Sequence, residues 1–170
     1  MGNLYAESGL LPNNLENTYS TKFGLSDAEY TAQVDNGIYT NFVKDSAGYG
    51  LAQWTYWTRK QNLLNFAKSK KKSIADLEMQ LEFLVKELKE DYTNSVYSVL
   101  KNAKTILEAS NAVLLKFERP ANQSVAVQNQ RASFGQKYYD KYAGNNDTIN
   151  PPEVFPIVSL GSTGETVKKI

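Results

Sequence analysis

Hydrophobic side chains recur with a helical period along most of the first 142 residues. The strongest case follows residue 73, where apolar residues return every three or four positions and therefore share one face of a helix. That face is formed by Ile74, Leu77, Leu81, Leu84, Val85 and Leu88. The pattern also predicts helices from about residue 56 to 70 and from about residue 124 to 142.

Three segments carry a pattern that starts helices, in which a hydroxyl residue is followed three positions later by an acid. The pairs are Ser26 and Glu29, Ser73 and Asp76, and Thr105 and Glu108. The hydroxyl accepts a hydrogen bond from an open backbone N–H, and the acid bonds back to the start of the helix. The helix that begins at the third pair is expected to end before Pro120, whose ring cannot continue a helix.

Residues 35–55 interrupt the helical pattern. Gly37, Gly48 and Gly50 lie among aromatic and β-branched residues in this segment. Glycine favours tight turns, and aromatic and β-branched residues favour strands, so we expect short strands or an ordered loop with tight turns. The predicted fold class is mainly α, a helical bundle with a small irregular β segment around residues 35–55.

The chain of 170 residues contains no histidine and no cysteine. Their absence excludes Ser-His-Asp and Cys-His nucleophilic sites, zinc sites that need imidazole or thiolate, disulfides and thiol redox chemistry. Acid–base chemistry would have to use Asp, Glu, Tyr or Lys. No group of carboxylates has the spacing of metal ligands, so we expect neither a metal nor another cofactor.

Charge and hydropathy narrow the range of partners. Lys and Arg total 19 against 18 Asp and Glu, a net charge of +1, which argues against binding to nucleic acid. The sequence contains no stretch of about 18 consecutive apolar residues, so we expect no membrane insertion. The first residues lack the basic start and apolar core of a signal peptide.

Glu7 is the first candidate for chemistry. Residues 3–9 are typical of the last turn of a helix that Gly9 closes. A carboxylate at this negative end of the helix dipole is destabilised as an anion, and apolar neighbours add desolvation in the same direction. Both effects favour the protonated form that a general acid needs for cleavage of a glycosidic bond. The alternative is a solvated surface residue.

The second candidate is residues 45–55, in which small residues alternate with Tyr49 and Trp54. Small residues let a backbone approach a bulky polar ligand closely, and aromatic rings offer faces on which the apolar side of a sugar can stack. The alternative is a tight β-turn whose aromatic residues belong to the core.

Together, the two segments resemble the phage tail-tip lysozyme family of the lysozyme-like superfamily, which includes goose-type lysozymes and soluble lytic transglycosylases. These relatives share a Glu-Ser pair that ends a helix and a later Gly-Leu-x-Gln turn, here residues 7–8 and 50–53. The resemblance runs over residues 1–142, including residues 117–120 and 135–139. It implies an α+β, lysozyme-like fold.

The resemblance implies a peptidoglycan glycosidase that cleaves between N-acetylmuramic acid and N-acetylglucosamine, with Glu7 protonating the leaving oxygen. Water or the sugar's own C6 hydroxyl would attack, so a lysozyme (muramidase) and a lytic transglycosylase both stay open. The residues expected to bind the substrate are Ser8, Tyr49, Gly50, Gln53, Trp54 and Trp57.

A second catalytic carboxylate would lie about 5 Å away in a retaining enzyme and ~6.5–9.5 Å away in an inverting one. Asp45 is the candidate because it precedes the glycine- and aromatic-rich turn, although an Asp that only caps the turn is the alternative. Asp35 and Glu118 are weaker candidates. Glu118 is expected to form a structural ion pair with Arg119.

The composition changes after residue 142. Residues 1–142 are expected to form the catalytic domain, without the beginning of the longer helix that precedes the glutamate in the family. Residues 143–156 are rich in Pro and Asn and predict a linker. Residues 157–170 resemble the opening of a peptidoglycan-binding domain of the three-helix kind.

Bacterial peptidoglycan is the expected partner. The resemblance implies an extracellular location, at the cell wall or on the virion, in an endolysin, a phage tail or a conjugation machinery. The alternative function is a non-catalytic peptidoglycan-binding or structural module of a phage tail or mobile element.

Overall fold

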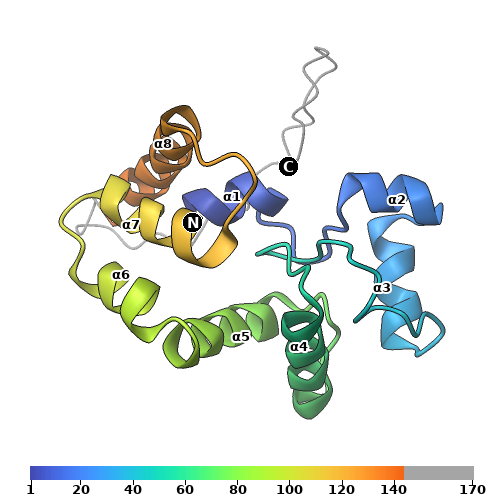
Figure 1. Ribbon diagram of the computed structural model, residues 1–170. Coiled ribbons are helices and arrows are strands. Elements are labelled where there is room, and N and C mark those ends of the chain that lie inside the picture. The colour runs from blue at the N-terminus through green and yellow to red at the C-terminus, as the bar shows by residue number, and fades with distance from the viewer. Residues whose placement is uncertain (144–170) are drawn as a thin grey trace.

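Residues 1–143, the part of the chain that the computed structural model describes, form a succession of helices (Figure 1). The elements are α1 (Gly2–Ser8), α2 (Asn17–Phe23), α3 (Asp27–Asp35), α4 (Trp57–Lys70), α5 (Leu77–Glu90), the π-helical η1 (Thr93–Tyr97), α6 (Ser98–Asn102), α7 (Ile106–Ala112), the π-helical η2 (Val113–Glu118) and α8 (Val125–Tyr142). Helices α1, α7 and α8 pack together, α2 and α3 lie on the opposite side, and α4 packs on α5. The prediction of a mainly α fold is confirmed.

Two of the three predicted helix starts are confirmed. Ser26 accepts a hydrogen bond from the N–H of Glu29 at 3.2 Å, and the Glu29 carboxylate accepts one from the N–H of Ser26 at 2.9 Å. Helix α3 therefore begins with a complete capping box. Thr105 caps α7 by accepting a bond from the N–H of Glu108 at 3.1 Å. Helices α4 and α8 lie within one residue of their predicted bounds.

The third predicted helix start is displaced by one turn. Helix α5 begins at Leu77, and its N-cap is Asp76, which accepts a hydrogen bond from the N–H of Met79 at 2.9 Å. The Ser73 hydroxyl instead donates to the carboxylate of Asp35, the last residue of α3, at 2.5 Å. Because Asp35 holds Ser73, residues 73–76 form a turn and the helix starts after it.

The buried face of α5 also differs from the predicted one. The prediction holds for Ile74, Leu84 and Leu88. The residues that lie at the surface instead are Leu77, Leu81 and Val85. The inward positions are taken partly by polar Gln80 and Glu87, because Gln80 accepts the N–H of Leu51 at 2.9 Å and Glu87 accepts the indole N–H of Trp54 at 3.0 Å. Hydrogen bonds to the loop therefore set the rotation of this helix.

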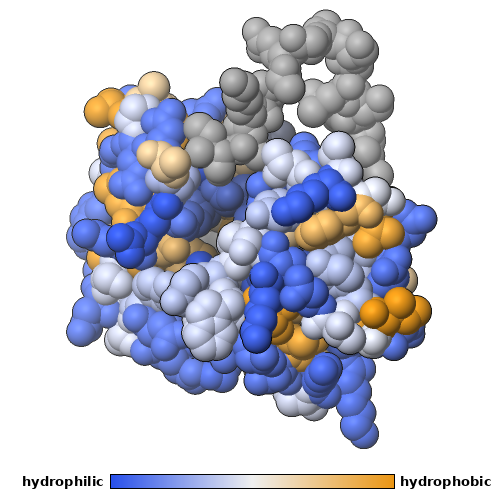
Figure 2. Space-filling model, turned by 45° about the vertical axis from the view of Figure 1, so that its right-hand side comes forward, coloured by the Kyte–Doolittle hydropathy of each residue, from blue (hydrophilic) through white to orange (hydrophobic). Residues whose placement is uncertain are grey.

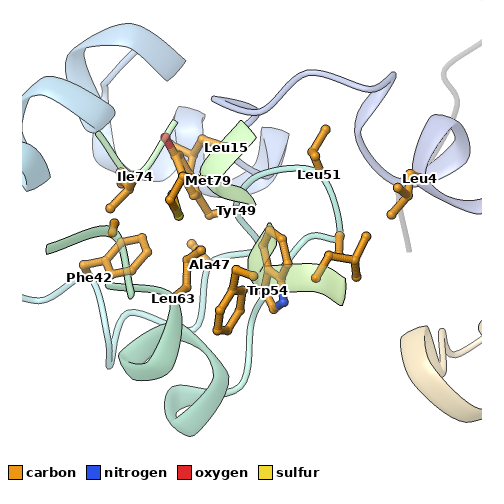
Figure 3. Packing of buried hydrophobic residues seen from close by; sticks show 14 of the residues in the cluster. Leu4, Leu15, Phe42, Ala47, Tyr49, Leu51, Trp54, Leu63, Ile74 and Met79 are labelled. Atoms are coloured by element: carbon orange, nitrogen blue, oxygen red, sulfur yellow. The ribbon is translucent and has the colours of Figure 1, made fainter. Parts of the chain in front are cut away.

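Residues 35–55 form an ordered loop with tight turns, one of the two predicted forms. In the described chain, the loop contributes only isolated antiparallel bridges, from Tyr49 to Leu15 and to Trp54. The side chains of Phe42, Tyr49 and Trp54 point into the hydrophobic core, where they pack near Leu63 (Figure 3). Burial of its aromatic residues, rather than a β-sheet, therefore holds the loop.

A buried ion pair lies beneath this loop. Asp45 accepts hydrogen bonds from the Lys60 ammonium at 2.5 Å and from the Tyr30 hydroxyl at 2.5 Å. Lys60 also donates to the Ala47 carbonyl at 2.8 Å. The side chains of Lys60 and Asp45 are 0% and 1% exposed. Burial lowers the pKa of Lys60, and the charge of Asp45 opposes that shift. The pair therefore ties the loop to α3 and α4.

Helix α1 is short and is stabilised by its packing on α7 and α8. A Cβ at Gly2 would overlap the backbone of Gly135 in α8, so the two helices touch through their glycines. The Asn3 amide donates to the Ser110 carbonyl of α7 at 3.0 Å. The Tyr5 ring meets Phe134 edge-on at 5.1 Å. These contacts compensate for a length at which an isolated helix is only marginally stable.

The face of the described part seen in Figure 2 is mostly hydrophilic, with separate apolar patches. None of the helices within residues 1–143 combines the length and the apolar character needed to cross a bilayer. The predicted linker, residues 143–156, and the predicted start of a second domain, residues 157–170, lie outside the described residues apart from residue 143.

Gly2→Ala is expected to lower the free energy of unfolding by about 1–3 kcal/mol, because the new methyl group overlaps the backbone of Gly135 and forces α1 away from α8. Urea unfolding followed by circular dichroism measures the change. Gly135→Ala is the matched control, since its methyl group would meet a side-chain atom of Ile106 at 3.0 Å instead of a backbone. Equal stability of the Gly2→Ala protein and the wild type would contradict the close helix contact.

Lys60→Met is expected to cost about 3–5 kcal/mol of stability, because it leaves the Asp45 carboxylate buried without a counter-ion. The double variant Lys60→Met/Asp45→Asn should be more stable than Lys60→Met alone, since it removes the uncompensated charge. Chemical denaturation of the three proteins checks this order. A double variant that is less stable than Lys60→Met would disprove the coupling.

Candidate active site

Glu7 lies in the last turn of α1, and Gly9 closes this helix, both as predicted. Gly9 has the left-handed conformation (φ 63°), and its N–H donates to the Tyr5 carbonyl at 2.8 Å. The Glu7 side chain is 13% exposed. The side chain is therefore largely covered by protein, and its Oε1 is buried. Part of the side chain still reaches solvent, as it must if the residue is to meet a polymeric ligand.

Ser8 joins the two sequence segments. Its hydroxyl lies 3.0 Å from the Leu4 carbonyl within α1 and 3.0 Å from the Leu51 carbonyl in the loop. Glu7 is thereby held next to the turn at residues 50–53. Ser8 is only 1% exposed, and its hydroxyl donates inside the protein. This burial does not fit the predicted role in substrate binding, because Ser8 positions the turn instead.

The turn at residues 50–53 is fixed by hydrogen bonds to Asn14. The N–H of Gly50 donates to the Asn14 carbonyl at 2.9 Å, and the Gln53 amide donates to the same carbonyl at 3.0 Å. The Gln53 amide also lies 3.1 Å from the Gly50 carbonyl. Gly50 is buried and Gln53 is half-buried. Gln53 is thus the member of this pair with surface left for a ligand.

The aromatic residues of the loop divide into buried and exposed ones. Tyr49 and Trp54 are both 0% exposed, so the prediction that they line a cleft does not fit their place in the core. Tyr56 and Trp57, at the start of α4, are 62% and 54% exposed, with ring centroids 6.2 Å apart. Of the predicted aromatic residues, Trp57 is therefore the one that a sugar can reach.

Asp45 does not meet Glu7 in the structure. Its carboxylate is occupied by Lys60 and Tyr30 in the core, and it accepts the N–H of Ala47 at 3.0 Å. The turn-capping alternative therefore describes Asp45, and its burial is incompatible with facing a cleft.

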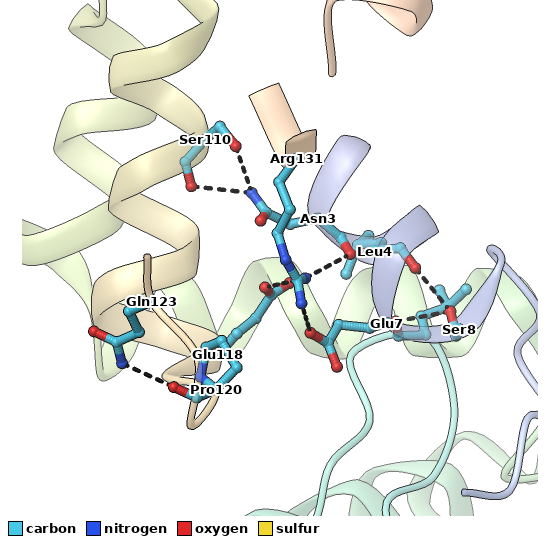
Figure 4. Close-up of polar contacts among 10 residues, drawn as sticks. Asn3, Leu4, Glu7, Ser8, Ser110, Glu118, Pro120, Gln123 and Arg131 are labelled. Atoms are coloured by element: carbon cyan, nitrogen blue, oxygen red, sulfur yellow. Dashed lines mark hydrogen bonds and ion pairs between the residues drawn. The ribbon is translucent and has the colours of Figure 1, made fainter. Parts of the chain in front are cut away.

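The close partner of Glu7 is Arg131 of α8. Arg131 Nη2 lies 2.6 Å from Glu7 Oε1, and Arg131 Nη1 donates to Glu118 Oε2 at 2.9 Å. Figure 4 shows the guanidinium between the two carboxylates. The predicted pair of Glu118 with Arg119 is replaced by this one, because Arg119 adopts the left-handed conformation that ends η2 (φ 51°).

Glu118 is the more deeply buried of the two acids. Its side chain is 2% exposed, and its Oε1 has no hydrogen-bond partner in the described residues. Burial raises the pKa of Glu118 to about 8, and the charge of Glu7 contributes to this shift while Arg131 opposes it. The protonated form of Glu118 is therefore favoured at neutral pH.

A second ion pair links this cluster to the loop. Arg59 of α4 donates to both oxygens of Glu87 of α5, at 2.6 and 2.8 Å. The same carboxylate accepts the Trp54 indole N–H. The Arg59 guanidinium lies 4.4 Å from the centroid of the Phe117 ring, the residue before Glu118. The loop, α5 and η2 are thereby connected.

The sequence pointed to Glu7 and the turn as candidates but did not identify Arg131 as the partner of Glu7. Arg131 is 124 positions from Glu7, within a helix whose local pattern marks no arginine as special. The only available signal was the resemblance at residues 117–120, which included Glu118 without its partner.

The assembled groups suit proton transfer. Glu7 reaches solvent, Glu118 holds a proton at neutral pH, and Arg131 neutralises one negative charge between them. Within residues 1–143, no group of three or more acidic side chains is arranged to hold a metal ion.

Two hollows on the described surface lie away from Glu7. The larger, of about 890 Å³, runs along the exposed side of α5, and the smaller, of about 350 Å³, lies between α4 and α5. Charged side chains border both, but neither contains the Glu7 cluster. We therefore locate the candidate site by the chemistry of its side chains rather than by the size of a hollow.

Comparison with known proteins places the chain in a family. No curated protein and no solved structure matches the chain. The family model described as phage tail lysozyme matches residues 1–142, which include α1, the loop and α8. Membership of this family implies that the substrate is peptidoglycan and that the protein is associated with the phage tail. The chain therefore belongs to the phage tail lysozyme family and is a lysozyme-like, peptidoglycan-degrading enzyme.

Proposed function

We propose that this protein is a glycosidase that cleaves peptidoglycan between N-acetylmuramic acid and N-acetylglucosamine, with Glu7 as the general acid. The observation that carries the proposal is the position of Glu7, at the solvent-reaching end of α1 and joined through Ser8 to the turn at residues 50–53. Family membership supports the same substrate.

Glu7 acts twice in the proposed reaction. In its neutral form it gives its proton to the bridging oxygen as the bond from that oxygen to the sugar carbon breaks. The resulting Glu7 carboxylate then accepts a proton from the attacking hydroxyl, which restores the neutral acid. Water as the attacking group gives a hydrolysed end, and the C6 hydroxyl of the same sugar gives an anhydro end.

The exposed ring of Trp57 is the proposed sugar contact, together with the half-buried Gln53. A flat aromatic face covers the C–H side of a sugar ring, and an amide bonds to its hydroxyl or acetamido groups. Contact at these two points would orient the chain over the turn next to Glu7. We propose that the enzyme acts outside the cell, at the bacterial wall.

Glu7→Gln is expected to lower the rate of muropeptide release by at least about 100-fold, because the amide cannot deliver a proton. Mass spectrometry of digested, purified peptidoglycan measures this rate and separates anhydro from reducing ends. Glu108→Gln is the matched control, since Glu108 is an exposed carboxylate that serves only the start of α7.

Full activity of a folded Glu7→Gln protein would refute the role of Glu7. Wild-type protein that sediments with insoluble peptidoglycan but releases no muropeptides would instead make this domain a non-catalytic binding module.

Trp57→Ala is expected to weaken binding to peptidoglycan fragments by about 2- to 13-fold, the loss of one aromatic contact worth roughly 0.5–1.5 kcal/mol. Isothermal titration with a muropeptide oligomer measures the affinity. Trp57→Phe should retain most of it. Tyr139→Ala, which removes an exposed ring on α8, is the control. Unchanged affinity in Trp57→Ala would remove Trp57 from the site.

A further inference from the structure

A single guanidinium serves both acids at the candidate site. Arg131 Nη2 contacts Glu7 at 2.6 Å, while Arg131 Nη1 contacts Glu118 at 2.9 Å and the Asn3 carbonyl at 3.3 Å. The side chains of Arg131, Glu7 and Glu118 are 10%, 13% and 2% exposed, so water screens the three charges weakly. The Glu118 oxygen that faces away from Arg131 has no hydrogen-bond partner in the described residues.

The charge of this cluster favours one bound proton. With both carboxylates ionised, the three side chains carry a net charge of −1 in a nearly dry environment, and one proton makes them neutral. Two further cations act on Glu118. They are the amino group of Met1, whose own pKa is lowered by burial, and Arg59, which is paired with Glu87. The cluster has one cation, Arg131, for two carboxylates, and neither of these further cations is free to neutralise the second carboxylate.

In the unliganded protein, burial favours this proton on Glu118. Glu118 is more buried than Glu7, and burial raises the pKa of Glu118 to about 8. Glu7 is then the carboxylate that Arg131 neutralises. This state is not ready for acid catalysis, since the proton lies on the acid that the substrate cannot reach.

We propose that Glu118 is a positioning residue for Glu7: the two acids share one proton and compete for Arg131, and a glycan that covers Glu7 draws the proton onto Glu7 and Arg131 onto Glu118. This inference rests on the proposed function of Glu7. One carboxyl loses the proton that the other gains, so the net charge of the three side chains is unchanged. Burial of Glu7 by the glycan supplies the bias, because it penalises the charged form of that side chain.

Glu118 therefore gives Arg131 a second place to bind. Without the Glu118 carboxylate, Arg131 would pair with Glu7 alone and stabilise the Glu7 anion, which cannot donate a proton. The amide of a glutamine has nearly the shape of the neutral acid, so Glu118→Gln keeps the packing while removing the competition.

The first test is the dependence of muropeptide release on pH. Glu118→Gln is expected to move the alkaline limb of the kcat/KM profile down by at least about one pH unit, a tenfold or greater loss of rate at pH 8, with the rate at acid pH kept within about threefold. Glu108→Gln, on the exposed start of α7, should leave the limb in place.

A uniform loss of rate at every pH, or an unmoved limb in folded Glu118→Gln protein, would overturn the proposal and leave Glu118 a structural residue. Thermal unfolding monitored by circular dichroism establishes whether the variant is folded.

The second test needs no activity and does not depend on the folding of Glu118→Gln. Carbon-13 NMR of the side-chain carboxyls should show Glu118 titrating in the alkaline range in the wild type and at least about one pH unit lower in Glu7→Gln, because Arg131 then serves Glu118 alone. An unchanged Glu118 midpoint would overturn the sharing of the proton even in an active enzyme. A coupled titration in a protein that releases no muropeptides would refute the proposed function while leaving the coupled pair in place.

Discussion

The contact of Arg131 with Glu7 and Glu118 is the interaction on which the candidate site depends. It connects the last helix of the described domain to the first, and it places one guanidinium against two carboxylates. A lone carboxylate at the end of α1 would be an ordinary surface group, whereas Glu7 shares its cation with the buried Glu118. The chemistry of Glu7 is therefore a property of α1, η2 and α8 together.

The loop beside Glu7 is held by polar anchors from the helices beneath it. Gln80 and Glu87 of α5 accept hydrogen bonds from Leu51 and Trp54, and Lys60 of α4 neutralises Asp45. Anchors of this kind fix a loop in one conformation, since a buried polar group without its partner is costly. A rigid turn next to Glu7 suits a site that must orient a long polymer.

Local patterns predicted the elements whose determinants are local. The capping residues Ser26 and Thr105 and the C-cap Gly9 were identified because each needs only its near neighbours. The rotation of α5 was not predicted, because it depends on bonds such as that between Glu87 and Trp54, 33 positions away. The burial of Trp54 was the alternative to its predicted role in sugar binding. The sequence also did not show that Arg131 pairs with Glu7, because only the packing of α8 on α1 brings the two side chains together.

The meeting of Gly2 and Gly135 has a consequence for how the site comes into being. These glycines come from opposite ends of the described domain, and the bond between Arg131 and the Asn3 carbonyl spans 128 positions. Arg131 follows Glu7 by 124 positions, so a nascent chain contains the acid long before the guanidinium that pairs with it has been synthesised. The ion pair between Arg131 and Glu7 can therefore form only after α8 has been synthesised and has docked on α1.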